Sequence, residues 1–252
     1  MVEAEGLTKF YGELEALSGV SFTVGEGEIL GLVGPNGAGK TTCLRILCGM
    51  IPSTRGTVRI GPHLLTKEPV EAKRLLAFIP DEPHLFDYLT VAEHLQFLAR
   101  IHRLGDVGAR AKSLLEEFAL ADKANDLPPT LSRGMKQKAA ICCGFLHNPK
   151  AIFFDEPLTG LDPAAIRRMK DAIRKRAEEG AAIVISSHLL GVVEELCHRV
   201  LIVQSGKTVA CGTREEIARL VPHIRADSSL EDIFLEVTEE AAHSGRAANT
   251  KP

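Results

Sequence analysis

One stretch of the sequence decides the fold, and it reads Gly34-Pro35-Asn36-Gly37-Ala38-Gly39-Lys40-Thr41-Thr42. The residues from Gly34 to Thr41 match the pattern G-x-x-x-x-G-K-[ST] of phosphate-binding loops. An almost wholly apolar run, Glu28–Val33, precedes the stretch, and Lys40–Met50 carries apolar residues at helical spacing. A glycine turn that matched by chance would need neither a strand before it nor a helix after it. We therefore predict a phosphate loop in an α/β protein.

Each residue type in this loop suits a nucleoside triphosphate. Gly37 and Gly39 let the backbone curl so that its N–H groups face phosphate oxygens. The helix that follows places roughly half a positive charge at its first turn, and Lys40 adds a full charge at the β- and γ-phosphates. The Thr41 hydroxyl is suited to ligate Mg²⁺. The loop thus predicts a triphosphate bound together with Mg²⁺.

Two further apolar strands end in polar residues of chemical interest. Ile152–Phe154 is followed by Asp155 and Glu156, and Ile183–Ile185 leads through two serines to His188. Because strands of an open α/β sheet present ligand-binding residues at their carboxyl ends, we expect Asp155 to hold Mg²⁺ and Glu156 to polarise the attacking water. His188 is expected to bond the γ-phosphate or that water. Taken alone, a surface strand end and a structural histidine are the alternative interpretations.

The predicted strands and helices fall into two groups. Strands alternate with helices in 1–80 and 150–212, whereas 81–149 holds three consecutive amphipathic helices and reads as an inserted helical lobe. Further helices are expected within 213–237, and the polar, small-residue tail 238–252 is expected to be disordered. The expected strands are Val2–Leu7, Val20–Val24, Gly56–Ile60, Leu76–Ile79, Ala151–Phe154, Ala181–Ser186, Val200–Gln204 and Thr208–Ala210, and the expected helices include Thr90–Leu104, Ala109–Leu120, Ser132–Leu146 and Pro163–Glu179.

Composition excludes several other classes of protein. The formal net charge of −3 gives no general attraction to nucleic acid, which we do not expect as a partner. No run approaches the roughly 20 apolar residues of a membrane helix, and the first residues lack a secretion signal. We therefore expect a cytoplasmic chain that reaches a membrane only through another polypeptide. The six cysteines form no C-x-x-C pair and no H-E-x-x-H occurs, so zinc chemistry is not expected.

The segment Leu131-Ser132-Arg133-Gly134-Met135-Lys136-Gln137 separates this chain from other phosphate-loop proteins. Serine is a good helix N-cap, and a glycine lets the backbone approach an anion at the start of a helix. The segment resembles the signature of ATP-binding cassette (ABC) ATPases, usually L-S-G-G-Q, and more closely the L-S-x-G-M-K-Q form of bacterial ABC-2-type exporters. The resemblance covers Val2 to Val237, and Ser229–Leu235 is similar to the ending of the export ATPases.

This resemblance implies the fold class and the roles of the site residues. The implied fold is an α/β P-loop NTPase, with a RecA-like mixed sheet covered by helices on both faces, an antiparallel β subdomain and an inserted α-helical signature subdomain. The implied ligands are ATP and Mg²⁺. The implied roles are catalytic for Glu156, His188 and Lys40, adenine stacking for Tyr11, contact with a second subunit's ATP for Ser132 and Gly134, and dimer communication for Asp162.

Two positions depart from the commoner family pattern. Asp81 stands where the family usually has a glutamine that reaches Mg²⁺ and water and links the helical lobe to the catalytic lobe. An aspartate accepts from metal-bound water but is shorter and charged, so Asp81 is kept as a metal-site residue with an altered Mg²⁺ dependence. Arg133 and Met135 replace the Gly and Gln of the usual signature, whereas Gly134 is retained, so we expect activity to be preserved.

The resemblance also implies a mechanism and partners. Two such subunits, identical or from two genes, would close head to tail on two ATP molecules, each held between the loop of one subunit and the signature of the other. The cycle would drive a permease on a separate chain, at the inner face of the cell membrane. A non-transport ABC ATPase of the iron–sulfur assembly type and a non-hydrolysing nucleotide sensor are the alternatives. The transported compound is not specified by the sequence.

Overall fold

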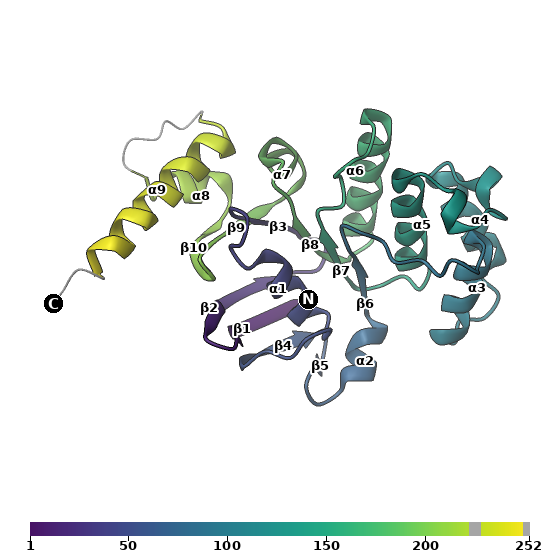
Figure 1. Cartoon of the computed structure of the whole chain (residues 1–252), viewed down its shortest axis with the longest axis horizontal. Coiled ribbons are helices and arrows are strands. Elements are labelled where there is room, and N and C mark those ends of the chain that lie inside the picture. The colour runs from purple at the N-terminus through teal and green to yellow at the C-terminus, as the bar shows by residue number, and fades with distance from the viewer. Residues whose placement is uncertain (222–227, 249–252) are drawn as a thin grey trace.

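A mixed six-stranded sheet runs through the protein (Figure 1), whose computed structural model describes residues 1–221 and 228–248, with side chains through residue 239. The strand order is β10-β9-β3-β8-β7-β6, and every neighbouring pair is parallel except β9 with β10. The parallel strands therefore bring their carboxyl ends to one edge of the sheet. The strands are β3 (Ile29–Val33), β6 (Leu76–Ile79), β7 (Ala151–Asp155), β8 (Ala182–Ser186), β9 (Arg199–Gln204) and β10 (Lys207–Gly212).

A second, antiparallel sheet has the order β2-β1-β4-β5 and consists of β1 (Val2–Tyr11), β2 (Leu14–Val24), β4 (Arg55–Ile60) and β5 (His63–Leu64). The first two strands are longer than the sequence pattern predicted. β1 continues past Gly6, which has a φ of +59° and lies where the register shifts, so a bulge replaces the expected end of the strand. The longer strand carries Tyr11 at its end.

Helices cover both faces of the mixed sheet, and three of them form the inserted lobe that Figure 1 shows beside β6 and β7. The lobe also contains two short 3₁₀ helices, Ala121–Lys123 and Pro128–Thr130. The fold class predicted from the sequence is confirmed. Two helices, α2 and α7, were not predicted, because a helix of one or two turns is too short for its apolar residues to show a helical period. The helices are α1 (Lys40–Leu47), α2 (Pro69–Arg74), α3 (Val91–Ile101), α4 (Gly108–Glu117), α5 (Arg133–Phe145), α6 (Pro163–Glu178), α7 (Leu190–Leu196), α8 (Arg214–Ala218) and α9 (Leu230–Ala248).

The central strands alternate their buried side chains between two hydrophobic layers. Leu30 and Phe153 belong to a layer shared with α1 and the antiparallel sheet, whereas Ile29 and Ile152 belong to a layer shared with α5, α6 and the inserted lobe. Every residue of β3, β7 and β8 is buried, as expected for strands covered on both faces. Such strands have fixed ends, so the polar residues that follow them are rigidly placed.

The prediction that residues 238–252 are disordered is wrong for most of that segment. Helix α9 continues to Ala248, and only 249–252 lie outside the described residues. The segment after Val237 is rich in glutamate and alanine, which are strong helix formers, and it extends a helix already anchored by the buried side chains of Leu230 and Ile233. Low hydrophobicity alone was therefore a poor guide at this position.

Candidate nucleotide-binding site

The phosphate loop connects β3 to α1 and is packed against the two sheets at glycine positions. A Cβ on Gly39, whose φ is +105°, would lie 2.6 Å from the carbonyl oxygen of Ala16 in β2. A Cβ on Gly34 would lie 2.1 Å from the carbonyl oxygen of Val203 in β9. Gly37, with a φ of +79°, faces open space instead. The loop thus has a packed side, where only glycine fits, and an open side where a ligand has room.

Lys40 lies along the loop and is 8% exposed. Its ammonium group donates to the carbonyl oxygens of Gly34 at 2.7 Å and Pro35 at 3.2 Å. Burial lowers the pKa of Lys40, while the nearby charges of Glu156 and Asp155 raise it. A cation is therefore held between the loop and the two acids, where the charge of a phosphate would be attracted.

The open side of the loop borders a cavity of about 590 Å³ that brings together residues from four parts of the chain. Asn36 to Thr42 form one wall, and Asp155 and Glu156 form another, as the sequence predicted for this sheet edge. Tyr11 lines the cavity from the end of β1 and is 45% exposed, with the ammonium of Lys9 5.2 Å from the centre of its ring. Sequence reasoning missed the other lining residues, which are Leu14, Glu15, Ala16, Ser205 and Gly206.

Asp155 is fixed by a residue of the neighbouring strand. One of its carboxylate oxygens, Oδ1, accepts a hydrogen bond of 2.7 Å from the hydroxyl of Ser186, which is fully buried in β8. The same hydroxyl accepts at 3.1 Å from the backbone N–H of Glu156. The sequence does not predict a role for Ser186, because a serine at the end of an apolar strand carries no motif of its own. Ser186 therefore positions both acids at the end of β7.

Glu156 and His188 contact each other directly. The Glu156 carboxylate accepts from Nδ1 of His188 at 2.8 Å and from the His188 backbone N–H at 3.3 Å. Glu156 has a φ of +48°, which is an uncommon value for a residue with a side chain. His188 is exposed, so the pair stands at the surface of the sheet edge. A carboxylate in this setting is equipped to accept a proton from water.

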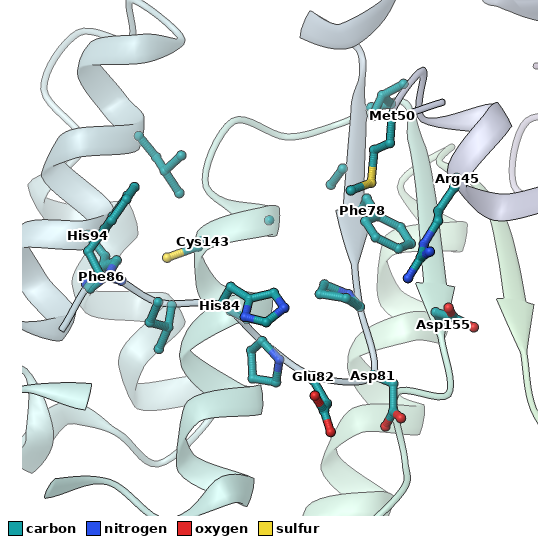
Figure 2. Close-up of a pocket in the computed structure, with 18 of the residues that line it drawn as sticks. Arg45, Met50, Phe78, Asp81, Glu82, His84, Phe86, His94, Cys143 and Asp155 are labelled. Carbon is teal, nitrogen blue, oxygen red and sulfur yellow. The ribbon is translucent and has the colours of Figure 1, made fainter. Parts of the chain in front are cut away.

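Asp81 follows β6 and borders a second, larger cavity of about 830 Å³ between the mixed sheet and the inserted lobe. Figure 2 shows Asp81 and Asp155 at the ends of neighbouring strands beside this cavity, which Thr41 and Glu156 also line. Asp81 forms an ion pair with Arg133 of the signature segment, with 3.0 Å between Oδ1 and Nη2. The predicted metal-site residues therefore share one cavity.

Ser132 and Gly134 lie at the start of α5 and do not line the cavity beside the phosphate loop. The Ser132 hydroxyl caps the helix by accepting from the Met135 backbone N–H at 3.3 Å. Asp162 caps α6 in the same way, accepting from Ala165 N–H at 2.8 Å, and this bond holds the pKa of Asp162 below its usual value. The structure thus leaves these three predicted residues away from the phosphate loop of their own chain.

The residues at the site suit a magnesium ion that is bound together with phosphate. Among the described residues, no cluster of three or more His, Cys, Asp or Glu side chains is arranged to hold a metal. Magnesium is usually bound through one or two carboxylates, with water and substrate phosphates completing six ligands. The hydroxyl of Thr41 and the carboxylate of Asp155, beside a cavity with room for phosphates, match that donor set.

A family model described as "ABC transporter" matches residues 17–159, which include both the phosphate loop and the signature segment. The chain belongs to the ABC transporter family. The ABC-type transporter ATP-binding protein EcsA of Bacillus subtilis is 33% identical to this ABC subunit, over 96% of this chain and 98% of EcsA. The linearmycin resistance ATP-binding protein LnrL of the same organism is 34% identical, over 86% and 70%.

Solved structures agree with this assignment of the ABC subunit. An ATP-binding subunit of an ABC transporter has a TM-score of 0.90 and 34% identity, over 94% of this chain and 99% of that one. The cassette MJ0796, in a dimeric post-hydrolysis state bound to ADP and Pi, has a TM-score of 0.76 and 26% identity, over 84% and 98%. The chain is therefore an ATP-binding ABC subunit and an ATPase. None of the helices in residues 1–221 and 228–248 has the length and apolar character needed to cross a bilayer.

Proposed function

We propose that this chain is the energising subunit of an export-type ABC transporter, whose membrane domain is a separate polypeptide. The observation that carries the proposal is the position of the signature: Ser132 and Gly134 lie at a capped helix start but outside the nucleotide cavity of their own chain. A helix start with a glycine is suited to bind a phosphate. In a head-to-tail dimer the ATP held by the second subunit would supply that phosphate.

The residues at the cavity divide the chemistry between them. Lys40 and the loop from Gly34 to Thr42 would bind the phosphates, and Tyr11 would stack on the adenine. Mg²⁺, held by Thr41 and Asp155 with Asp81 reaching its water, would neutralise charge on the β- and γ-phosphates. Glu156 would orient water and take its proton, and His188 would hold the Glu156 carboxylate toward the phosphate. Asp162 would take part in communication between the two subunits when the dimer closes.

The membrane partner is assigned to the larger cavity between the mixed sheet and the inserted lobe (Figure 2). Its wall includes three large apolar side chains that are exposed, Met50, Phe86 and Phe97. Glu82 lies at one end, next to the Asp81–Arg133 ion pair, which favours a basic residue on the incoming segment. We propose that a short cytoplasmic helix of the permease, with an apolar face and one basic residue, occupies this groove. The export direction rests on the relatives and on the signature, since LnrL is called a resistance protein.

The experiment that tests this function uses Glu156→Gln with the parent chain and Lys40→Ala as controls. With ATP, Glu156→Gln is expected to elute as a dimer in size-exclusion chromatography and to lose hydrolysis by a factor of about 10² to 10⁴, whereas Lys40→Ala stays monomeric. Tagged Glu156→Gln isolated from solubilised membranes is expected to retain a protein with several hydrophobic spans. Hydrolysis at the parental rate would remove Glu156 from its role, and recovery of water-soluble partners alone would reject the transporter assignment.

A further inference from the structure

The two residues that depart from the commoner family pattern, Asp81 and Arg133, are paired with each other. Asp81 stands in place of a glutamine and Arg133 in place of a glycine, and their side chains meet at 3.0 Å. They are separated by 52 residues in the sequence, yet the start of α5 faces the loop that follows β6. The guanidinium group of Arg133 lies within ion-pair distance of the Asp81 carboxylate. An ion pair therefore stands at two positions where the commoner family pattern has a neutral glutamine and a glycine.

A second bond joins the same two segments one helical turn further along. Gln137, on the same face of α5 as Arg133, donates to the carbonyl oxygen of Pro80 at 3.1 Å. Its side chain is only 3% exposed, and its Oε1 has no hydrogen-bond partner among the described residues. Because a buried amide is costly to place, this bond fixes where the Pro80–Asp81 segment lies against α5. The ion pair at Arg133 is the exposed, more easily exchanged part of the same attachment.

Arg133 also lies against the loop that precedes α6. A Cβ on Gly160 would lie 3.7 Å from both Cδ and Nε of Arg133, and a Cβ on Gly134 would lie 3.4 Å from Leu161. The Arg133 side chain therefore stands between the Asp81 loop and the loop carrying Asp162. These are ordinary van der Waals distances, so the three segments pack around this one side chain.

We propose that Arg133 is a positioning residue that links, within one subunit, the loop beside its own metal site to the signature. Asp81 shares a cavity with Thr41, Asp155 and Glu156. A nucleotide bound there would therefore change the electrostatic surroundings of the Asp81 carboxylate. Through the ion pair, that change reaches Arg133 and hence the signature residues Ser132 and Gly134 on either side of it. This inference rests on the proposed function, because only in a head-to-tail dimer does the signature act on the other subunit's ATP.

The test is amide hydrogen exchange of the whole chain, measured without nucleotide and then with Mg-ADP. Without nucleotide, Asp81→Asn and Arg133→Gln are each expected to speed exchange in residues 79–86 and 132–137 by about two- to fivefold, the range for an exposed ion pair. The double variant should be no faster than the faster single variant, because both substitutions remove one interaction. Lys123→Gln, which breaks an exposed pair with Asp126 in the same lobe, is the matched control.

The Mg-ADP arm tests transmission. In the parent, Mg-ADP is expected to slow exchange both in the phosphate loop, residues 34–42, and in the signature, residues 132–137, although the signature does not line the cavity beside that loop. In Arg133→Gln the protection of 34–42 should remain and that of 132–137 should be lost, with partial recovery in Arg133→Lys.

Three results would overturn the link: signature protection unchanged in Arg133→Gln, no signature protection in the parent, or effects of the two single variants that multiply in the double variant. If Mg-ADP failed to protect residues 34–42 in the parent, the nucleotide site itself would be wrong. That failure concerns the proposed function and is distinguishable from a failure of the link, which the nucleotide-free arm measures separately.

Discussion

Replacing Ser186 by alanine removes a hydroxyl group that contacts both acids at the end of β7. The Ser186 hydroxyl donates to Asp155 at 2.7 Å and accepts from the Glu156 N–H at 3.1 Å, and the hydroxyl is fully buried. The Glu156 N–H keeps a second acceptor, the Ser186 carbonyl at 3.2 Å, so the loss falls mainly on the Asp155 carboxylate. A hydrogen bond to a charged, buried group contributes about 1.5–3 kcal/mol, and we expect Ser186→Ala to lower the unfolding free energy by that amount.

Thermal unfolding measures this loss, with Ser187→Ala as the matched control. For a protein of this size about 1 kcal/mol corresponds to roughly 2–4 °C, so Ser186→Ala is expected to lower the Tm by about 3–12 °C. Ser187 is equally buried, but its hydroxyl accepts only one neutral backbone N–H, that of Leu189 at 3.0 Å. Its loss contributes about 0.5–1.5 kcal/mol and a correspondingly smaller shift. A decrease in Tm for Ser186→Ala no larger than for Ser187→Ala would refute the reasoning.

The same variant has a functional readout. A carboxylate that has lost its hydrogen bond to Ser186 is free to turn away from the metal position, so half-maximal ATP hydrolysis should require more Mg²⁺. The ATP affinity measured without Mg²⁺ should be unchanged, because the phosphate loop is untouched. An equal Mg²⁺ requirement in parent and Ser186→Ala would show that Ser186 supports the fold but not the metal site.

Three further predictions concern Lys40, Gly39 and His147. Lys40→Ala is expected to weaken ATP binding by about 10- to 150-fold in isothermal titration, the equivalent of one charge-assisted hydrogen bond, and retained affinity would contradict its place at the phosphates. Gly39→Ala is expected to lower the unfolding free energy by more than Gly180→Ala. Both glycines have a positive φ, at which a residue with a side chain costs about 1–2 kcal/mol. A Cβ at Gly39 would also lie 2.6 Å from a backbone oxygen, whereas a Cβ at Gly180 would meet no atom within 4 Å. Burial lowers the pKa of His147 to about 4, and that of the stacked His102 also lies below its usual value. Because the unfolded chain then binds more protons, the unfolding free energy should fall as pH is lowered from about 6.5 to about 4, and His147→Gln, which still donates to the Leu76 carbonyl, should flatten that slope in denaturant titrations.

The features that the sequence predicted well are those encoded by neighbouring residues. The phosphate loop is a continuous motif between an apolar strand and an amphipathic helix, and the acids at Asp155 and Glu156 end a strand buried on both faces. Such local patterns fix strand direction and hence the sheet edge to which the residues come. The mixed sheet, the inserted lobe and the cavity lining from Asn36 to Thr42 could be predicted for that reason.

The features that the sequence did not reveal depend on contacts between distant segments. Ser186 supports Asp155 from the next strand, 31 residues away, and neither residue type specifies the other. The register of β7 against β8, which sets Asp155 opposite Ser186, is decided by packing and not by a motif. The extension of α9 beyond Val237 was missed because the low hydrophobicity of the tail was weighted above its helix propensity.

The strand order explains why the site residues contact one another in pairs. In the sheet β8, β7 and β6 are neighbours, so the residues that end these strands lie along one edge in the same order. Ser186 at the end of β8 contacts Asp155 at the end of β7, and His188, two residues after β8, contacts Glu156, which directly follows β7. Asp81 after β6 borders the same cavity as those acids and pairs with Arg133 of α5. The contacts at these strand ends form the route that the proposed link between Asp81 and the signature would use. The signature lies at the end of that route, which is why its response to nucleotide is the measurement that discriminates between a set of separate motifs and one connected site.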